Sequence, residues 1–138
     1  MRLVVDTNIL VSALLAGTSL PAQLIVLWRQ GRFDLLTAEQ LDELRRVTRY
    51  PKIRERLAPA LAGRLVNDLC TLSVVVDKLP TVDVSRDPDD NYLLAIAVAG
   101  SADFLLTGDK RDLLSLERYG STRILTVRAF LSSQGLLP

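Results

Sequence analysis

The chain has 138 residues, of which 49% are hydrophobic and 24% charged, and its 17 basic and 16 acidic residues leave a formal net charge of +1. It contains no histidine and one cysteine, Cys70, which excludes Ser-His-Asp and Cys-His catalysis, His-ligated zinc, thiolate metal cages and an intrachain disulfide. The length predicts a single domain over residues 1–138, carboxylates are the expected catalytic groups, and a nucleic-acid partner would be recognised by local charge.

The first half of the chain alternates short apolar runs with amphipathic segments. The apolar runs predict strands over residues 3–5, 33–36 and 74–76. Helical spacing predicts helices over residues 8–16, from about Pro21 to Gly31, from the cap Thr37 to about Tyr50, and over residues 60–71. Pro51 is expected to break the third of these helices.

The second half continues the alternation. We expect a helix that opens at Asp87 and Pro88 and runs through residue 99, a strand over 104–106, a helix over 112–119 and a last strand over 123–127. Five strands that alternate with helices predict an α/β fold, in which an open parallel sheet is covered by helices. The few aromatic residues predict a core of Leu, Val, Ile and Ala.

The N-terminal residues and the lengths of the apolar runs indicate where in the cell the protein is expected. Met1 and Arg2 lead directly into a strand pattern, which is not typical of a secretory leader. No apolar run approaches the ~20 residues that a membrane span needs. We therefore expect a cytoplasmic protein with no membrane partner.

Acidic residues stand where an open sheet forms its ligand site, outside the carboxyl ends of the strands. Asp6 follows the first strand and Asp109 follows the fourth. If these two strands are neighbours, the two carboxylates face each other across the crevice. Asp90 lies in the first turn of the helix before the fourth strand, and Glu43 lies on the helix after the second. All four side chains can converge on one mouth.

Convergence of four carboxylates implies a cation. Two unit charges ~4 Å apart repel by about 4 kcal/mol at an effective dielectric constant near 20. Oxygen ligands without His or Cys favour Mg²⁺ or Mn²⁺ over zinc or copper. Such a metal lowers the pKa of a bound water and neutralises phosphate charge, so hydrolysis of a nucleic acid is the leading hypothesis.

Each acid also has a structural interpretation. Asp6 can cap the following helix, and Asp87, Asp89 and Asp90 are typical of a helix start. Glu43 can be a solvated partner of a neighbouring arginine, and a basic helix face is commonly only solvated. The functional interpretation rests on the joint occurrence of acids at the right strand ends.

Four blocks of the sequence together resemble the PIN-domain family, and in particular its branch of toxins of prokaryotic toxin-antitoxin systems, related to the VapC ribonucleases. The blocks are Asp6 to Leu15, Leu41 to Ile53, Arg86 to Asn91 and Leu106 to Lys110. The resemblance implies a three-layer α/β/α sandwich with a five-stranded parallel sheet of order 3-2-1-4-5. It also implies a Mg²⁺- or Mn²⁺-dependent endoribonuclease that hydrolyses RNA phosphodiester bonds.

The resemblance carries catalytic and metal-binding roles to Asp6, Glu43, Asp90 and Asp109. Asp6 and Asp109 would bind the metal directly, and Glu43 and Asp90 would hold its waters. Asn8 and Thr107 would be polar neighbours that orient the carboxylates. Relatives often carry a further acid two residues after the position of Asp109; here Arg111 stands there, and Asp112 follows as a supporting polar candidate.

The stretch from Arg45 to Arg56 is strongly basic, with a lone Glu55. We expect Arg45, Arg46, Arg49 and Lys52 to hold the RNA backbone beside the cleaved bond.

The family resemblance further implies a cognate antitoxin protein and a homodimer. The sequence leaves two other hypotheses. One is a non-catalytic or regulatory PIN-like module that binds proteins; the other, a phosphotransfer domain, is disfavoured because Thr7 and Asn8 stand where it needs a second acid.

Overall fold

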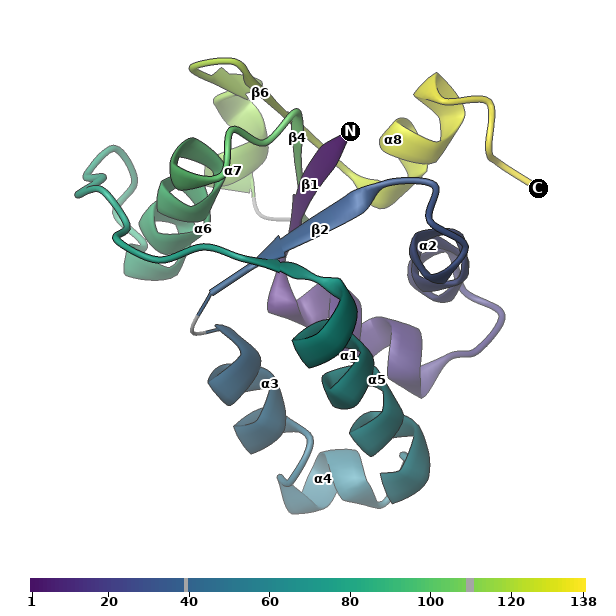
Figure 1. The fold of residues 1–138 in the computed structure, drawn as a ribbon. Coiled ribbons are helices and arrows are strands. Elements are labelled where there is room, and N and C mark those ends of the chain that lie inside the picture. The colour runs from purple at the N-terminus through teal and green to yellow at the C-terminus, as the bar shows by residue number, and fades with distance from the viewer. Residues whose placement is uncertain (39, 109–110) are drawn as a thin grey trace.

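The sheet is the centre of the molecule (Figure 1). The computed structural model describes residues 1–38, 40–108 and 111–138. Within these residues the sheet has six strands in the order β3-β2-β1-β4-β6-β5. The strands are β1 (Arg2–Val5), β2 (Asp34–Thr37), β3 (Val74–Val75), β4 (Phe104–Leu106), β5 (Arg118–Tyr119) and β6 (Thr122–Leu125). Neighbouring strands are parallel except for the β5–β6 pair, which is antiparallel.

Helices cover both faces of the sheet (Figure 1). The described helices are α1 (Thr7–Leu15), α2 (Leu20–Arg29), α3 (Gln40–Val47), α4 (Pro51–Arg54), α5 (Pro59–Leu72), α6 (Pro88–Ala99), α7 (Arg111–Ser115) and α8 (Val127–Ser133). One face carries α6 and α7, and the other carries α1, α2 and α8. Helices α3, α4 and α5 form a group beyond one end of the sheet, at the bottom of Figure 1.

The central strand β1 shows why the sheet is covered twice. Leu3 and Val5 are buried with residues of α1, α2 and α8, whereas Val4 is buried with residues of α6 and α7. Successive side chains of a strand point to opposite faces, so a continuous apolar run needs two apolar layers. The predicted three-layer α/β/α fold is confirmed.

The predicted strand order is confirmed for the five parallel strands. Because β1 pairs in parallel with both β2 and β4, the strand order reverses between β1 and β4, where an open sheet forms its ligand site. Asp87 caps α6 through a hydrogen bond from the amide of Asp89, at 2.9 Å, with Pro88 in the first turn, as the sequence predicts.

The predicted cap at Thr37 is wrong. Thr37 is the last residue of β2, and α3 begins at Gln40. The Thr37 hydroxyl is hydrogen-bonded to the hydroxyl of Ser73, at 2.7 Å, and its carbonyl accepts from Val76. The side chain therefore joins β2 to the residues around β3 and does not cap the next helix.

Helix α4, which begins at Pro51, was not predicted either, and the C-terminal third contains further differences. The helix predicted over 112–119 ends at Ser115, because Glu117 adopts a left-handed backbone with φ of 57°. The chain then forms β5 and turns at Gly120, whose positive φ suits a two-residue hairpin loop. The last strand ends at Leu125, and Val127 begins α8, which is capped by the Thr126 hydroxyl. The sequence prediction contained neither β5 nor α8.

Among the described helices, none has both the length and the apolar character to cross a membrane alone. Only α1 and α2 taken together meet that test, and they are bent by 101°.

Candidate functional site

Asp6 stands at the carboxyl end of β1, beside the carboxyl end of β4. The backbone ladder continues past both strands, since the Asp6 amide donates to Leu106 and the Thr107 amide donates to Leu125, both at 3.0 Å. The Thr107 hydroxyl donates to Asp6 Oδ2 at 3.3 Å, and the Asn8 amide donates to Asp6 Oδ1 at 3.1 Å. Asp6 is therefore both the N-cap of α1 and a buried carboxylate, with 5% of its surface exposed.

Asp90 is the second buried acid. It lies in the first turn of α6 with 2% of its surface exposed. The Ser85 hydroxyl donates to Asp90 Oδ2 at 3.1 Å. Ser85 is itself held by Asn91, whose Oδ1 accepts from the Ser85 amide at 2.9 Å and whose Nδ2 donates to the Ser85 carbonyl at 2.9 Å. This clamp fixes the loop that orients the Asp90 carboxylate.

Glu43 approaches from α3. Its Oε2 lies 3.5 Å from the hydroxyl of Thr7, the first residue of α1, and its side chain is half-buried. Packing of α3 against α1 thus brings an acid from beyond the second strand to the end of the first. The predicted solvated ion pair of Glu43 with an arginine is absent among the described residues.

A small cavity of about 40 Å³ lies where these elements meet. Its described lining comes from the β1–α1 junction, α3 and the start of α6: Asp6, Thr7, Asn8, Glu43, Asp89, Tyr92 and Leu93. Three of these side chains are carboxylates and none of those described is basic. The space exceeds what a single water molecule needs.

Three of the four predicted acids are thus placed around one edge of the sheet: Asp6 and Glu43 line the cavity, and Asp90 is buried beside the lining residue Asp89. Asn8 also lines the cavity, and its backbone amide is the group that bonds Asp6. The fourth acid, Asp109, lies outside the described residues.

Asp112 is exposed in the first turn of α7 and is not among the described lining residues. Its carbonyl accepts from the Ser115 hydroxyl at 2.9 Å. Its supporting role stays a prediction.

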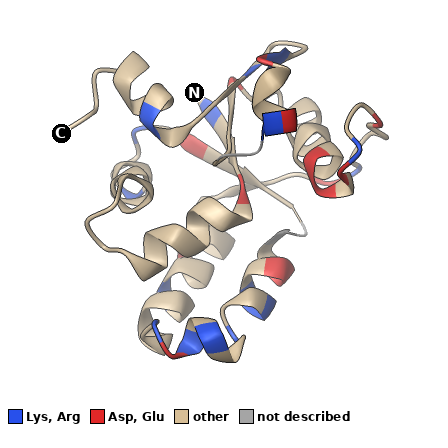
Figure 2. Ribbon diagram, turned by 180° about the vertical axis from the view of Figure 1, so that it is seen from behind, with Lys and Arg blue, Asp and Glu red and all other residues tan. Residues whose placement is uncertain are grey.

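The predicted RNA-binding residues separate into two groups. All four are exposed, but only Arg45 and Arg49 line a larger cavity between α3, α4 and α5. Figure 2 shows Lys and Arg concentrated on α4, at the end of the molecule away from the sheet. The role of these four residues in RNA binding stays a prediction.

Sequence reasoning missed three neighbours of the acids. Ser85 and Tyr92 belong to no motif: Ser85 contacts Asp90 because the loop before α6 folds back on that helix, and Tyr92 lines the cavity from α6 itself. Thr7 was noted only as a capping residue type, although its position beside Asp6 could have suggested contact with the site.

The donors present suit a hard divalent cation. Carboxylate and hydroxyl oxygens are the ligands that Mg²⁺ and Mn²⁺ prefer, and Mg²⁺ usually binds through one or two carboxylates while it keeps several waters. The described acids do not by themselves form a group of three that could enclose an ion. A site of this kind agrees with a cation held in part by water and by substrate.

Comparison with known proteins adds the following. The model of the PIN domain family matches residues 2–111. The chain is 27% identical over 118 residues to the uncharacterized protein MJ1680 of Methanocaldococcus jannaschii, a match that covers 84% of this chain and 75% of that protein. The comparison with solved structures gives no significant match. PIN domains are generally nucleases.

Proposed function

The chain belongs to the PIN-domain family, and from this premise we propose that it is a Mg²⁺- or Mn²⁺-dependent endoribonuclease that acts as the toxin of a toxin-antitoxin pair. The observation that supports the proposal is that Asp6 and Glu43, from separate segments, line one small cavity, and that Asp90 is buried in the first turn of α6, a helix that supplies further described lining residues. Two of these acids, Asp6 and Asp90, are almost fully buried.

The chain's own residues prepare the site for a cation and a phosphate. The Thr107 hydroxyl and the Asn8 amide hold the two oxygens of Asp6 in one orientation. Ser85 does the same for one oxygen of Asp90, and Thr7 contacts Glu43. In the proposal, Asp6 and Asp109 bind the cation directly, and Glu43 and Asp90 accept hydrogen bonds from its waters.

When bound, the cation would neutralise phosphate charge and lower the pKa of a water molecule. Both effects serve hydrolysis of a phosphodiester bond. Because neither requires an imidazole, the absence of histidine from the chain is compatible with this chemistry.

Cleavage of a labelled RNA pool tests the proposal. We expect the wild-type protein to cleave RNA with Mn²⁺ or Mg²⁺, and we expect EDTA, Asp6→Asn and Asp90→Asn each to lower the rate by at least about a hundredfold. Asp83→Asn is the matched control, because Asp83 is exposed in the loop before α6 and does not line the cavity. Cleavage that persists in EDTA or in both site variants would overturn the proposal.

The partners and location belong to the same proposal. A toxin of this family would act on cytoplasmic RNA, form a homodimer and be restrained by a cognate antitoxin. Co-expression with the product of the neighbouring gene tests this: relief of growth arrest and a co-purifying complex are expected. Growth that is unaffected by the protein alone would contradict the toxin role while leaving the nuclease activity intact.

A further inference from the structure

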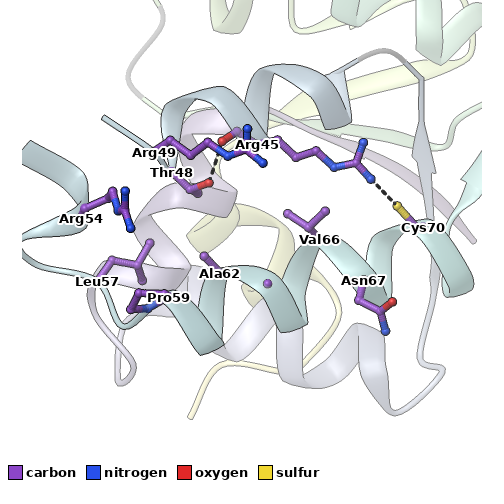
Figure 3. A pocket seen from close by; sticks show the side chains of 11 residues that line it. Arg45, Thr48, Arg49, Arg54, Leu57, Pro59, Ala62, Val66, Asn67 and Cys70 are labelled. Atoms are coloured by element: carbon purple, nitrogen blue, oxygen red, sulfur yellow. Dashed lines mark hydrogen bonds between the residues drawn. The ribbon is translucent and has the colours of Figure 1, made fainter. Parts of the chain in front are cut away.

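A second cavity lies between α3, α4 and α5 and has a volume of about 450 Å³ (Figure 3). It shares no described lining residue with the acidic cavity. Arg45 of this pocket lies about 200° around α3 from Glu43, since a helix has 3.6 residues per turn. One helix therefore carries the acidic site on one face and this pocket on another.

The pocket is strongly basic. Figure 3 shows three arginine side chains around it: Arg45 from α3, Arg49 from the turn that follows α3, and Arg54 from α4. None of the lining residues that the structure describes is acidic. Three guanidinium groups around one pocket repel one another, and a bound anion would remove that repulsion.

The three arginines retain hydrogen-bonding capacity. Arg45 donates to the Cys70 sulfur at 3.3 Å and to the exposed carboxylate of Asp42 at 3.4 Å. Sulfur is a weak acceptor, and the second contact is long. The guanidinium groups of Arg49 and Arg54 form no hydrogen bond or ion pair with any residue that the structure describes. Planar guanidinium groups match phosphate oxygens in pairs.

The remainder of the wall is apolar with one free amide. Leu57 and Ala62 are buried, Val66 is half-buried, and these side chains face the pocket from α5 and the segment before it (Figure 3). The exposed side chain of Asn67 lies on the same wall and can meet the polar edge of a ligand. The volume falls within the roughly 300–1,000 Å³ typical of small-ligand sites.

We propose that this pocket binds a nucleoside phosphate. Arg49 and Arg54 hold the phosphate, Arg45 adds a third positive charge, and the base lies against the apolar wall with Asn67 at its polar edge. A phosphate monoester carries about −1.5 to −2 charges at pH 7. It therefore balances the charge of three arginines better than a ligand with a single carboxylate does. The nucleotide is either free or part of an RNA strand, and the second case rests on the proposed ribonuclease function.

Cys70 provides a direct readout, because it is the only cysteine of the chain, is exposed and lines the pocket. Its rate of alkylation by N-ethylmaleimide is measured in EDTA, with increasing AMP, adenosine, inorganic phosphate or a trinucleotide of adenylate. AMP is expected to slow alkylation saturably. Adenosine and phosphate, each of which lacks one half of the ligand, should need at least about tenfold higher concentrations for half-protection.

Variants assign the protection to the pocket. Arg49→Gln and Arg54→Gln should each raise the AMP concentration for half-protection about tenfold, because each removes a charge-assisted hydrogen bond. Arg56→Gln makes the same charge change at an exposed residue outside the lining and should match the wild type. Gly63→Met leaves all charges in place but extends a side chain from a lining position that has open space, so it should also weaken protection.

The relative protection by the trinucleotide and by AMP distinguishes RNA from a free nucleotide as the ligand. Half-protection by the trinucleotide at lower concentration than AMP assigns the pocket to RNA; the reverse order assigns it to a free nucleotide. Absence of protection by every phosphate-bearing probe, equal protection by adenosine and AMP, or protection unchanged in both arginine variants would overturn the proposal. Since EDTA prevents metal-dependent cleavage, failure of the ribonuclease proposal would leave this result unaffected.

Discussion

Thr107 and Asp6 are 101 residues apart in the chain, yet the hydroxyl of the first donates to the carboxylate of the second. Parallel pairing of β1 with β4 brings them together, since each residue follows the end of its strand. Thr107 is completely buried, so its hydroxyl has no water to exchange with. The contact fixes which way Asp6 presents its oxygens.

Replacement of Thr107 by valine removes this donor while preserving shape. Groups that orient a metal ligand typically change metal affinity by about 10–100-fold, so we expect Thr107→Val to raise the Mn²⁺ concentration for half-maximal RNA cleavage about tenfold. Thr122→Val is the matched control, because Thr122 is also buried and donates to the carbonyl of Ala102, away from the site. An equal change in both variants would mean that Thr107 acts only through stability.

At this scale the sequence predicted where Asp6 and Asp90 lie relative to the sheet but not which residues contact them. Asp6 and Asp90 could be selected because an acid at a strand end or a helix start has a defined position relative to the sheet. Ser85 could not, because its contact with Asp90 depends on the Asn91 clamp and thus on the path of a loop. Loop paths leave no periodic pattern in a sequence.

Two glycines of the helices differ in the space around them. Gly100 is the C-cap of α6, and a Cβ atom there would collide with the buried side chain of Leu36 on β2. Gly63 lies within α5, and a Cβ atom there would meet nothing within 4 Å. The first glycine allows a helix to end close against the sheet, whereas the second has no such packing role.

Alanine at these two positions should therefore change stability in opposite directions. Gly100→Ala is expected to lower the free energy of unfolding by about 1–3 kcal/mol, as overpacking of a core does. Gly63→Ala is expected to raise it by about 0.5–1 kcal/mol, because glycine is unfavourable inside a helix. Urea unfolding measures both. A Gly100→Ala protein as stable as the wild type would show that Leu36 can move aside at little cost.

Helices and strands marked by a clear apolar pattern or a capping sequence were predicted well, whereas those determined by tertiary contacts were not. The strand over 104–106 and the start of α6 were located from an apolar run and a capping sequence. The hairpin that contains β5 was missed because a short helical pattern covered it and the left-handed Glu117 interrupts that pattern without a glycine. For α8, the cap Thr126 was assigned to the preceding strand.

For the whole molecule, the net charge of +1 conceals two separated regions of opposite charge. Acids lie at the carboxyl edge of the sheet, and basic residues concentrate on the group of helices α3, α4 and α5 (Figure 2). The same helix, α3, reaches both regions. The phosphates of an RNA chain can contact the basic region directly and the acidic region through a bound cation.

The central claim is that the buried acids form a divalent-cation site, and thermal unfolding in the presence of Mn²⁺ tests it without any substrate. A cation that binds only the folded protein at a hundred times its Kd contributes about 2.7 kcal/mol, which corresponds to a rise in Tm of roughly 10 °C for a chain of this size. The account predicts this rise for the wild type, and its near loss in Asp6→Asn and Asp90→Asn. No rise in the wild type, or the same rise in all three proteins, would contradict the account.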